Sequence, residues 1–348
     1  MRASESSGRH YRLGLNIYDD YYGPKNCFSV NEITRTARLA EQNGYDSVWL
    51  NEDIGRDSFL VLGNIAAHTN RIRLATGIVN IFARSPVQIA MAAATLHELS
   101  NGRAILGLGL GHDRSVQRGH GIRISQRFDR MREYVTIIRK KFSGRTFSHS
   151  GNHFQIKDTK LNVNTVDPPI PIYLAAAHPK TIQLAGEIAD GVLLLMPSTH
   201  WIKETVFPRL HEGATRAGRD SRKLKVIAIL HCYLSDTNKN AYDDAKKAVA
   251  SYALGKSFRE MVSGMGFSKE IQKVYESLTQ GDRESAWKNV PNELANELVA
   301  VGPPTAVASR LRDFFNLGVD LPILSVRPRS GEGIKMVEST IPLLAPRS

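Results

Sequence analysis

The sequence predicts a parallel α/β barrel of the (β/α)8 type with a helical insertion near residues 255–295. Two observations lead to this fold class. Eight segments of strand length alternate with segments of helical periodicity along the 348 residues, and such alternation is typical of βα units around a parallel sheet. Residues 71–112 also form a complete strand–helix–strand unit with a glycine-rich end. In α/β barrels the carboxyl ends of the strands hold the active site.

The expected strands and helices follow in order from local signals. Ser29 with Glu32 has the spacing of a capping box, and Ser85 with Pro86 opens the next well-marked helix. The eight strands are expected at residues 11–18, 45–50, 71–76, 104–108, 172–176, 192–196, 225–234 and 322–326. The helices are expected at residues 29–43, 58–68, 85–99, 126–142, 179–186, 199–217, 240–254 and 302–317, with Gly186 interrupting or ending the fifth. Residues 144–161 resemble a hairpin outside the barrel, and residues 1–10 a frayed tail. The chain is therefore expected to be one TIM-barrel domain spanning residues 1–348.

Composition sets outer bounds on function. A formal charge of +12 and a pI near 9.7 suit anionic partners such as a phosphorylated cofactor, an acidic substrate or nucleic acid, and equally a generally basic enzyme. The two cysteines, Cys27 and Cys232, are too few for a disulfide framework or a zinc site. Neither a signal peptide nor an apolar run of about 20 residues is evident. We therefore expect a cytoplasmic protein without a membrane segment and without a metal.

Basic residues are concentrated between residues 114 and 145, where ten Lys and Arg stand against two acidic residues. Arg123, Arg127 and Arg130 share one face if the helix there begins early. This stretch is either a docking surface for a polyanion or a solvated helix face.

A phosphate site is predicted where the strand at 172–176 ends. Ala175, Ala176 and Ala177 let backbone N–H groups approach a ligand, and the helix that Pro179 opens adds its positive end. His178 lies between them, and Lys180 adds a charge. Close packing of helix on strand explains the same alanines. Ser198 and Thr199, after the next strand, either donate to this phosphate or cap the following helix.

Several segments together resemble the luciferase-like flavin and deazaflavin oxidoreductases. They include Thr76–Asn80, Ala83–Pro86, Leu99–Arg103, Leu174–Thr181 and Leu184–Gly191. The resemblance covers most of the chain outside residues 255–295. It is strongest to the branch that uses the deazaflavin coenzyme F420, notably the methylenetetrahydromethanopterin reductases.

The resemblance implies roles for individual residues. Gly77 and Ile78 match a non-proline cis peptide that backs the deazaflavin ring, together with Val79 and Asn80; from the residues alone Gly77 is an ordinary strand-ending glycine. The spacing of Gly107, Gly109 and Gly111 is not that of a dinucleotide-binding fingerprint. Gly109 is expected to lie beside the ring. Glu52, Asp53 and His112 are the expected catalytic residues, as proton donors or cofactor contacts, although loop carboxylates are often simply solvated. The reductases have acidic residues near the ends of strands one, two and four, where this chain has Asn16, Glu52 and His112, and Asp53 replaces their usual histidine.

These observations predict an oxidoreductase that transfers a hydride between F420 and a small organic substrate. The main alternative is an FMN-dependent monooxygenase, which would use the same phosphate site. A cofactor-less protein that binds anions or nucleic acid through residues 114–145 is the alternative from another class. The resemblance also allows a homodimer.

Overall fold

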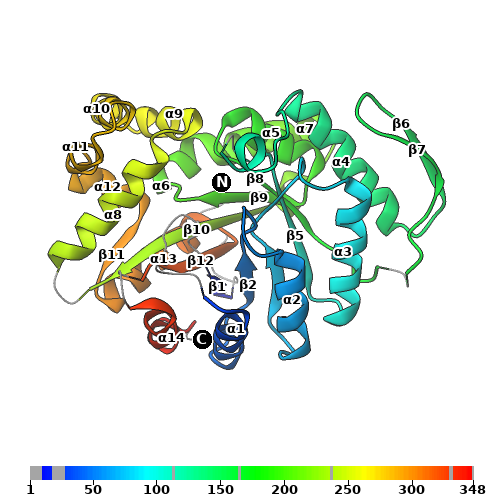
Figure 1. Ribbon diagram of the computed structural model, residues 1–348, viewed down its shortest axis with the longest axis horizontal. Coiled ribbons are helices and arrows are strands. Elements are labelled where there is room, and N and C mark those ends of the chain that lie inside the picture. The colour runs from blue at the N-terminus through cyan, green and yellow to red at the C-terminus, as the bar shows by residue number, and fades with distance from the viewer. Residues whose placement is uncertain are drawn as a thin grey trace.

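The computed structural model describes residues 10–17, 28–111, 114–163, 166–235, 238–328 and 332–346. Eight parallel strands form a closed ring, because each strand pairs with two neighbours and the last pairs with the first (Figure 1). The strands are β1 (Gly14–Asn16), β2 (Ser47–Leu50), β3 (Arg73–Thr76), β5 (Ala104–Gly109), β8 (Ile172–Ala175), β9 (Gly191–Leu195), β10 (Lys225–Leu234) and β12 (Leu321–Val326). The predicted (β/α)8 barrel is confirmed. Two short strands were not predicted. β4 (Val79–Asn80) pairs with the carboxyl end of β5, and β11 (Ala300–Gly302) pairs with β10.

Alternate residues of the strands fill the inside of the barrel. The interior cluster consists of buried apolar side chains, which are Trp49, Ala75, Ile105, Tyr173, Leu193, Ile227, Ile229, Leu321 and Ile323. Toward the carboxyl ends the interior becomes polar: Asn16 accepts a hydrogen bond from Ser325 Oγ (2.9 Å) and donates one to the Trp49 carbonyl (3.0 Å). The carboxyl end of the barrel is thus the end that offers polar groups, as in other α/β barrels.

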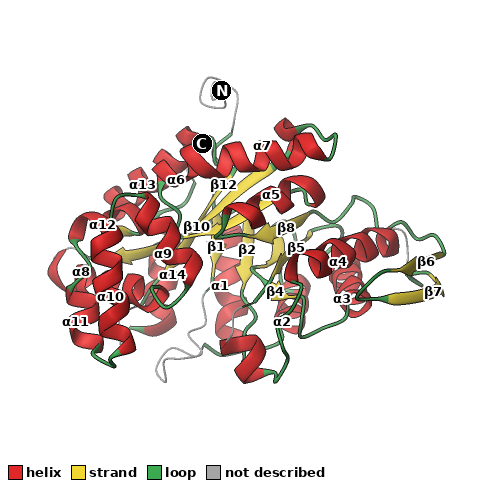
Figure 2. Ribbon diagram, turned by 90° about the horizontal axis from the view of Figure 1, so that it is seen from above, coloured by secondary structure: helices red, strands yellow, loops and turns green. Residues whose placement is uncertain are grey.

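Helices surround the barrel, and local chemistry explains where they begin (Figure 2). Both capping signals are confirmed, since Ser29–Glu32 and Ser85–Gln88 form complete capping boxes. The surrounding helices are α1 (Val30–Gln42), α2 (Ser58–Ala67), α3 (Pro86–Leu99), α4 (Arg127–Phe142), α5 (Pro179–Ile188), α6 (Thr199–Trp201), α7 (Phe207–Arg216), α13 (Pro304–Leu317) and α14 (Gly333–Leu343).

Three helix predictions need correction. Gly186 lies inside α5 and does not end it, because α5 packs so closely on α7 that no side chain fits there. The helix expected at 199–217 is helical throughout, but it contains an unpredicted π-helical turn at Ile202–Val206 between α6 and α7. Helix α4 does not begin early: Gln126 is left-handed (φ 43°), so Arg123 lies outside the helix and shares no helical face with Arg127.

After β10 come the helix expected at 240–254 and then the helices of the insertion expected near residues 255–295. These helices gather at one end of the molecule, whereas the expected hairpin projects from the other end (Figures 1 and 2). The helices are α8 (Asn238–Tyr252), α9 (Lys256–Gly264), α10 (Ser268–Thr279), α11 (Arg283–Lys288) and α12 (Asn292–Leu298), and the hairpin pairs β6 (Phe147–Ser150) with β7 (Gln155–Thr159). Of the helices in the described ranges, none is long and apolar enough to cross a membrane.

Candidate functional site at the barrel mouth

The predicted site residues within the described ranges follow neighbouring strands at the carboxyl end of the barrel. Glu52 and Asp53 follow β2, residues 77–80 follow β3, and Gly109 ends β5; Ala175–Lys180 end or follow β8, and Ser198 and Thr199 follow β9. Because these strands are neighbours in the ring, their ends form one continuous part of the rim. His112 lies outside the described residues.

The peptide bond between Gly77 and Ile78 is cis, as the resemblance implied. The Gly77 N–H donates to the Leu50 carbonyl (2.6 Å), and the Ile78 carbonyl accepts from the Glu52 N–H (3.1 Å). These bonds attach the segment to the end of β2. The side chain of Ile78 packs onto the interior cluster.

Glycines at the end of β5 make room for this segment. A Cβ on Gly109 would lie 2.5 Å from Ile78 Cδ1 and 3.6 Å from the Ala175 Cβ. Ile78, Gly109 and Ala175 therefore form a continuous apolar surface. On β9, the strand next to β8, Leu195 lies two residues after the interior residue Leu193, so its side chain also faces the barrel interior. Leu195 is 42% exposed. We call these four residues the apolar floor; it lies at the mouth, and at Leu195 it is open to solvent.

Asn80 has a local structural role. Its Oδ1 accepts hydrogen bonds from the N–H groups of Phe82 (3.0 Å) and Ala83 (2.8 Å), and its side chain is buried. Val79 is buried in the main core beside Leu108. Val79 and Asn80 therefore hold the segment 77–80 in place through these local contacts.

Glu52 is held by an ion pair. Its carboxylate accepts hydrogen bonds from Arg84 Nε (3.1 Å) and Nη2 (2.8 Å), and from the Ser58 N–H (2.9 Å) and Oγ (3.1 Å). Arg84 Nη2 also donates to Asp57 (2.8 Å). Two carboxylates thus fix one guanidinium at the rim, with the Arg84 side chain 23% exposed. Asp53, the next residue, is partly exposed.

The charges in this group stabilise one another. Burial alone raises the pKa of Asp57, but hydrogen bonds from Arg84 and from the N–H groups of Leu60 and Phe59 lower it overall. Burial alone lowers the pKa of Arg84, and its bonds to Asp57 and Glu52 raise it overall. Asp57 and Arg84 are therefore both charged at neutral pH. The pairing of Arg84 with Glu52 was not predictable from the sequence, because 32 residues separate them.

The amino end of α5 presents donors at the mouth. His178 is the N-cap residue, and its Nδ1 accepts the Lys180 N–H (3.1 Å). Within the described ranges, the backbone N–H groups of Ala177 and His178 make no hydrogen bond. Small side chains and unpaired N–H groups at a helix N-terminus form a donor set that suits an anion. Ala177 and Lys180 are exposed.

Ser198 and Thr199 show the capping arrangement. Ser198 is fully buried, and its Oγ accepts the Trp201 N–H (3.0 Å) as the N-cap of α6. Thr199 is the first residue of α6 and is partly buried.

A histidine that the sequence analysis missed lies near the end of β10. His231 is 1% exposed, pairs in register with Ser325, and its ring centre lies 6.0 Å from that of Tyr252. Burial and the nearby charge of Arg327 hold its pKa well below the ordinary value, so the imidazole is neutral at pH 7. The signal was available, because a histidine near the carboxyl end of a predicted barrel strand meets the rule applied to Glu52.

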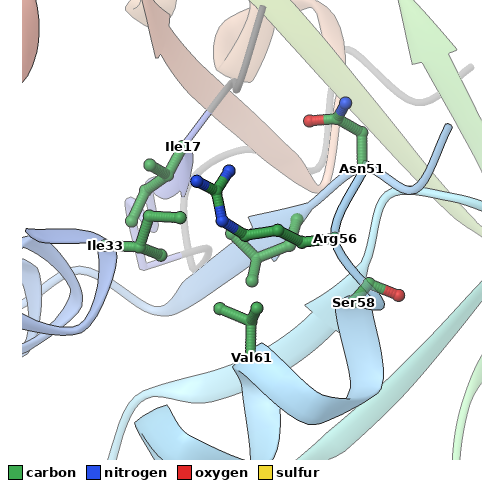
Figure 3. Close-up of a pocket in the computed structure, with 7 residues that line it drawn as sticks. Ile17, Ile33, Asn51, Arg56, Ser58 and Val61 are labelled. Atoms are coloured by element: carbon green, nitrogen blue, oxygen red, sulfur yellow. The ribbon is translucent and has the colours of Figure 1, made fainter. Parts of the chain in front are cut away.

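Two cavities lie outside this surface. One, of about 10 Å³, lies between β1, α1 and α2 and has room for about one water molecule (Figure 3). Another, of about 170 Å³, lies beside His97 and Asp167 at the amino end of the barrel. The first cavity is lined by Leu50, Asn51 and Ser58 and so borders the rim beside Glu52, whereas the second lies away from the mouth. Over the ranges that the structure describes, no group of three or more His, Cys, Asp or Glu side chains is arranged to hold a metal ion.

A closed parallel barrel with an apolar floor, fixed charges and a helix N-terminus at its carboxyl rim is the architecture of α/β-barrel enzymes, whose sites lie at this end. The family model described as luciferase-like monooxygenase matches residues 13–321. The chain belongs to this family and is an enzyme of that superfamily.

Relatives and solved structures agree with this assignment. The chain is 27% identical to a 5,10-methylenetetrahydromethanopterin reductase from Methanolobus tindarius over 317 residues, covering 90% of this chain and 96% of the relative. The coenzyme F420-dependent tetrahydromethanopterin reductase of Methanopyrus kandleri has a similar structure, with a TM-score of 0.80, 22% identity and 97% of each chain covered. A monooxygenase from Streptomyces bottropensis matches with a TM-score of 0.68 and 22% identity over 96% of this chain and 98% of its own. At these identities the two structural matches establish the fold alone.

Proposed function

We propose that this protein is an F420-dependent oxidoreductase that transfers a hydride between the deazaflavin and a small organic substrate. The observation that supports it most is the similarity over nine-tenths of the chain to a methylenetetrahydromethanopterin reductase. The similar fold of a reductase named as F420-dependent agrees with it.

The residues present fit such a cofactor. A flat tricyclic ring needs an apolar surface open to solvent, and the apolar floor supplies one. A phosphorylated arm needs donors, which are the N–H groups of Ala177 and His178 at the amino end of α5. The Glu260 carboxylate lies 3.6 Å from His178 Nε2, at the same end of α5. When bound, F420 supplies the two-electron carrier; the protein supplies binding and orientation.

The chain's own residues then have distinct tasks. Gly77 and Ile78 support one face of the ring, Val79 and Asn80 hold that segment in place, and Gly109 leaves space for it. Ala175–Ala177, His178 and Lys180 bind the phosphorylated arm, and Ser198 and Thr199 hold the neighbouring turn.

For proton transfer we propose Asp53 and His112, with Glu52 in a positioning role. The Glu52 carboxylate accepts four hydrogen bonds, two from Arg84 and two from Ser58, so we assign it the orientation of Arg84. Asn16 and Asp53 stand where the methylenetetrahydromethanopterin reductases have an acidic residue and a histidine. We therefore propose a substrate other than the pterin.

A cofactor titration tests the proposal. The purified protein is titrated with F420 and separately with FMN, and binding is followed by fluorescence. We expect micromolar or tighter binding of F420 and at least tenfold weaker binding of FMN. Tighter binding of FMN favours the monooxygenase alternative. Binding of RNA or DNA that weakens steeply with salt, without affinity for either cofactor, favours the nucleic-acid alternative.

We also propose that the protein forms a homodimer through α2 and α3. Leu60 (76% exposed), Met91 (52%) and Leu99 (59%) leave apolar surface on these two neighbouring helices. Helix α2 has no charged residue, and a helix that is apolar on all sides is usually buried. A second copy of the same surface would cover it.

Sedimentation velocity tests the dimer. Leu60→Glu should convert a dimer to a monomer at micromolar concentration. Leu254→Glu is the matched control, because Leu254 is 59% exposed on the insertion, away from α2 and α3. A monomeric wild-type protein would refute the proposal.

A further inference from the structure

The helical insertion reaches the amino end of α5 through one side chain. Glu260, on α9, places Oε2 3.6 Å from His178 Nε2 and Oε1 3.7 Å from Lys256 Nζ. The neighbouring α9 residues Phe258, Met261 and Val262 are buried in the core. Because these apolar contacts anchor the helix, the position of Glu260 beside α5 is set by packing and not by the weak contact itself.

The hydrogen bond at the other ring nitrogen determines what His178 offers. Nδ1 accepts the Lys180 N–H, so it has no proton, and in the neutral ring the proton is on Nε2. That N–H faces Glu260, but 3.6 Å is too long for a hydrogen bond. The donor therefore remains available beside the backbone N–H groups of Ala177 and His178.

The Glu260 contact contributes little to folding. Its side chain is 46% exposed and that of His178 is 35% exposed, and ion pairs so open to water add little stability. The effect of a carboxylate at this place falls instead on any other anion that approaches α5. A second negative charge within about 5 Å is repelled, by an amount that water reduces without removing.

We propose that Glu260 is an affinity-determining residue of the cofactor site: the insertion places a carboxylate that opposes the phosphorylated arm and so weakens its binding. This inference rests on the function proposed above. It predicts that removal of the charge strengthens binding of a phosphorylated ligand and leaves an unphosphorylated one unaffected.

Four probes and two variants test the inference. The probes are F420, the same deazaflavin without its phosphodiester arm, FMN and riboflavin. Glu260→Gln should bind F420 and FMN about fivefold more tightly than wild type at low salt, with a smaller difference at 0.5 M NaCl. Binding of the two unphosphorylated probes should not change. Glu284→Gln is the matched control, because Glu284 is an exposed residue of the insertion paired with Lys288.

The outcomes separate the two proposals. Equal dissociation constants for wild type and Glu260→Gln, with F420 bound by both, would overturn the role of Glu260 and leave the proposed function standing. An equal change for phosphorylated and unphosphorylated probes would also overturn it, because a general rearrangement of the mouth would then be responsible. If wild type and both variants bind none of the probes, the proposed function fails, and the role of Glu260 fails with it.

Discussion

Replacing Gly186 by alanine tests how closely α5 is fixed on α7. A Cβ there would lie 2.3 Å from the Leu210 carbonyl oxygen, 2.9 Å from the Ala214 nitrogen and 3.1 Å from the Gly213 Cα. These are backbone atoms, so no side-chain rotation relieves the overlap, and one helix must move. Overpacking of this kind costs about 3 kcal/mol, whereas alanine gains about 1 kcal/mol over glycine inside a helix. We expect Gly186→Ala to lower the free energy of unfolding by about 2 kcal/mol.

Thermal unfolding followed by circular dichroism at 222 nm measures this change. With an unfolding entropy near 2.1 cal/mol/K per residue, about 0.7 kcal/mol/K for 348 residues, Tm should fall by about 3 °C. Gly264→Ala is the matched control, since Gly264 ends α9 with nothing within 4 Å of a built Cβ, and its Tm should stay the same or rise by about 1 °C. A Gly186→Ala protein as stable as wild type would refute the reasoning.

Three further predictions concern polar side chains held by hydrogen bonds or ion pairs. Burial alone raises the pKa of Glu41, but hydrogen bonds from the N–H groups of residues 72, 71 and 70 lower it overall. The stability that the Glu41 charge contributes is complete above pH 4.5 and is lost as pH falls through the lowered pKa. The Tm difference between wild type and Glu41→Gln should therefore be constant from pH 6 to 8 and shrink below pH 4.5. Ser325→Ala should cost about 1–3 kcal/mol in urea unfolding, because it leaves the buried Asn16 oxygen without its donor; an unchanged midpoint would contradict this. Glu52→Gln and Arg84→Met should each lower kcat/KM about tenfold. Because both substitutions remove the same ion pair, kcat/KM of the double variant should be no lower than that of the less active single variant. Additive losses would show that the two residues act separately.

Local signals determined most of the fold. The capping residues at Ser29 and Ser85 and the alternating strands lie within a few positions in sequence, so their consequences are visible without the tertiary structure. The helix expected to end at Gly186 was wrong for the opposite reason: a glycine that stops a helix and a glycine that admits a neighbouring helix are identical in sequence. Only the facing Gly213 in α7 distinguishes them. The strands β4 and β11 are too short, at two and three residues, to give a periodic signal.

The site was predictable in position more than in detail. The rule that barrel chemistry lies at carboxyl ends of strands indicated Glu52, Gly77 and Ala175, which follow or end neighbouring strands in the structure. Partners from distant segments were not predictable, since the ion pair of Glu52 with Arg84 and the contact of Glu260 with His178 depend on packing. The roles assigned to these residues in catalysis and cofactor binding stay predictions.

The closure of the ring has a consequence for how the protein is made. Strand β1 has only three residues and is paired on one side by β12, which lies some 300 positions later in the chain. During synthesis, β1 leaves the ribosome long before β12 has been made. One edge of β1 therefore stays unpaired until nearly the whole polypeptide has emerged. Chains truncated before β12 should therefore form open sheets with an unpaired edge. Such chains should be targets for chaperones and proteases rather than partly active enzymes.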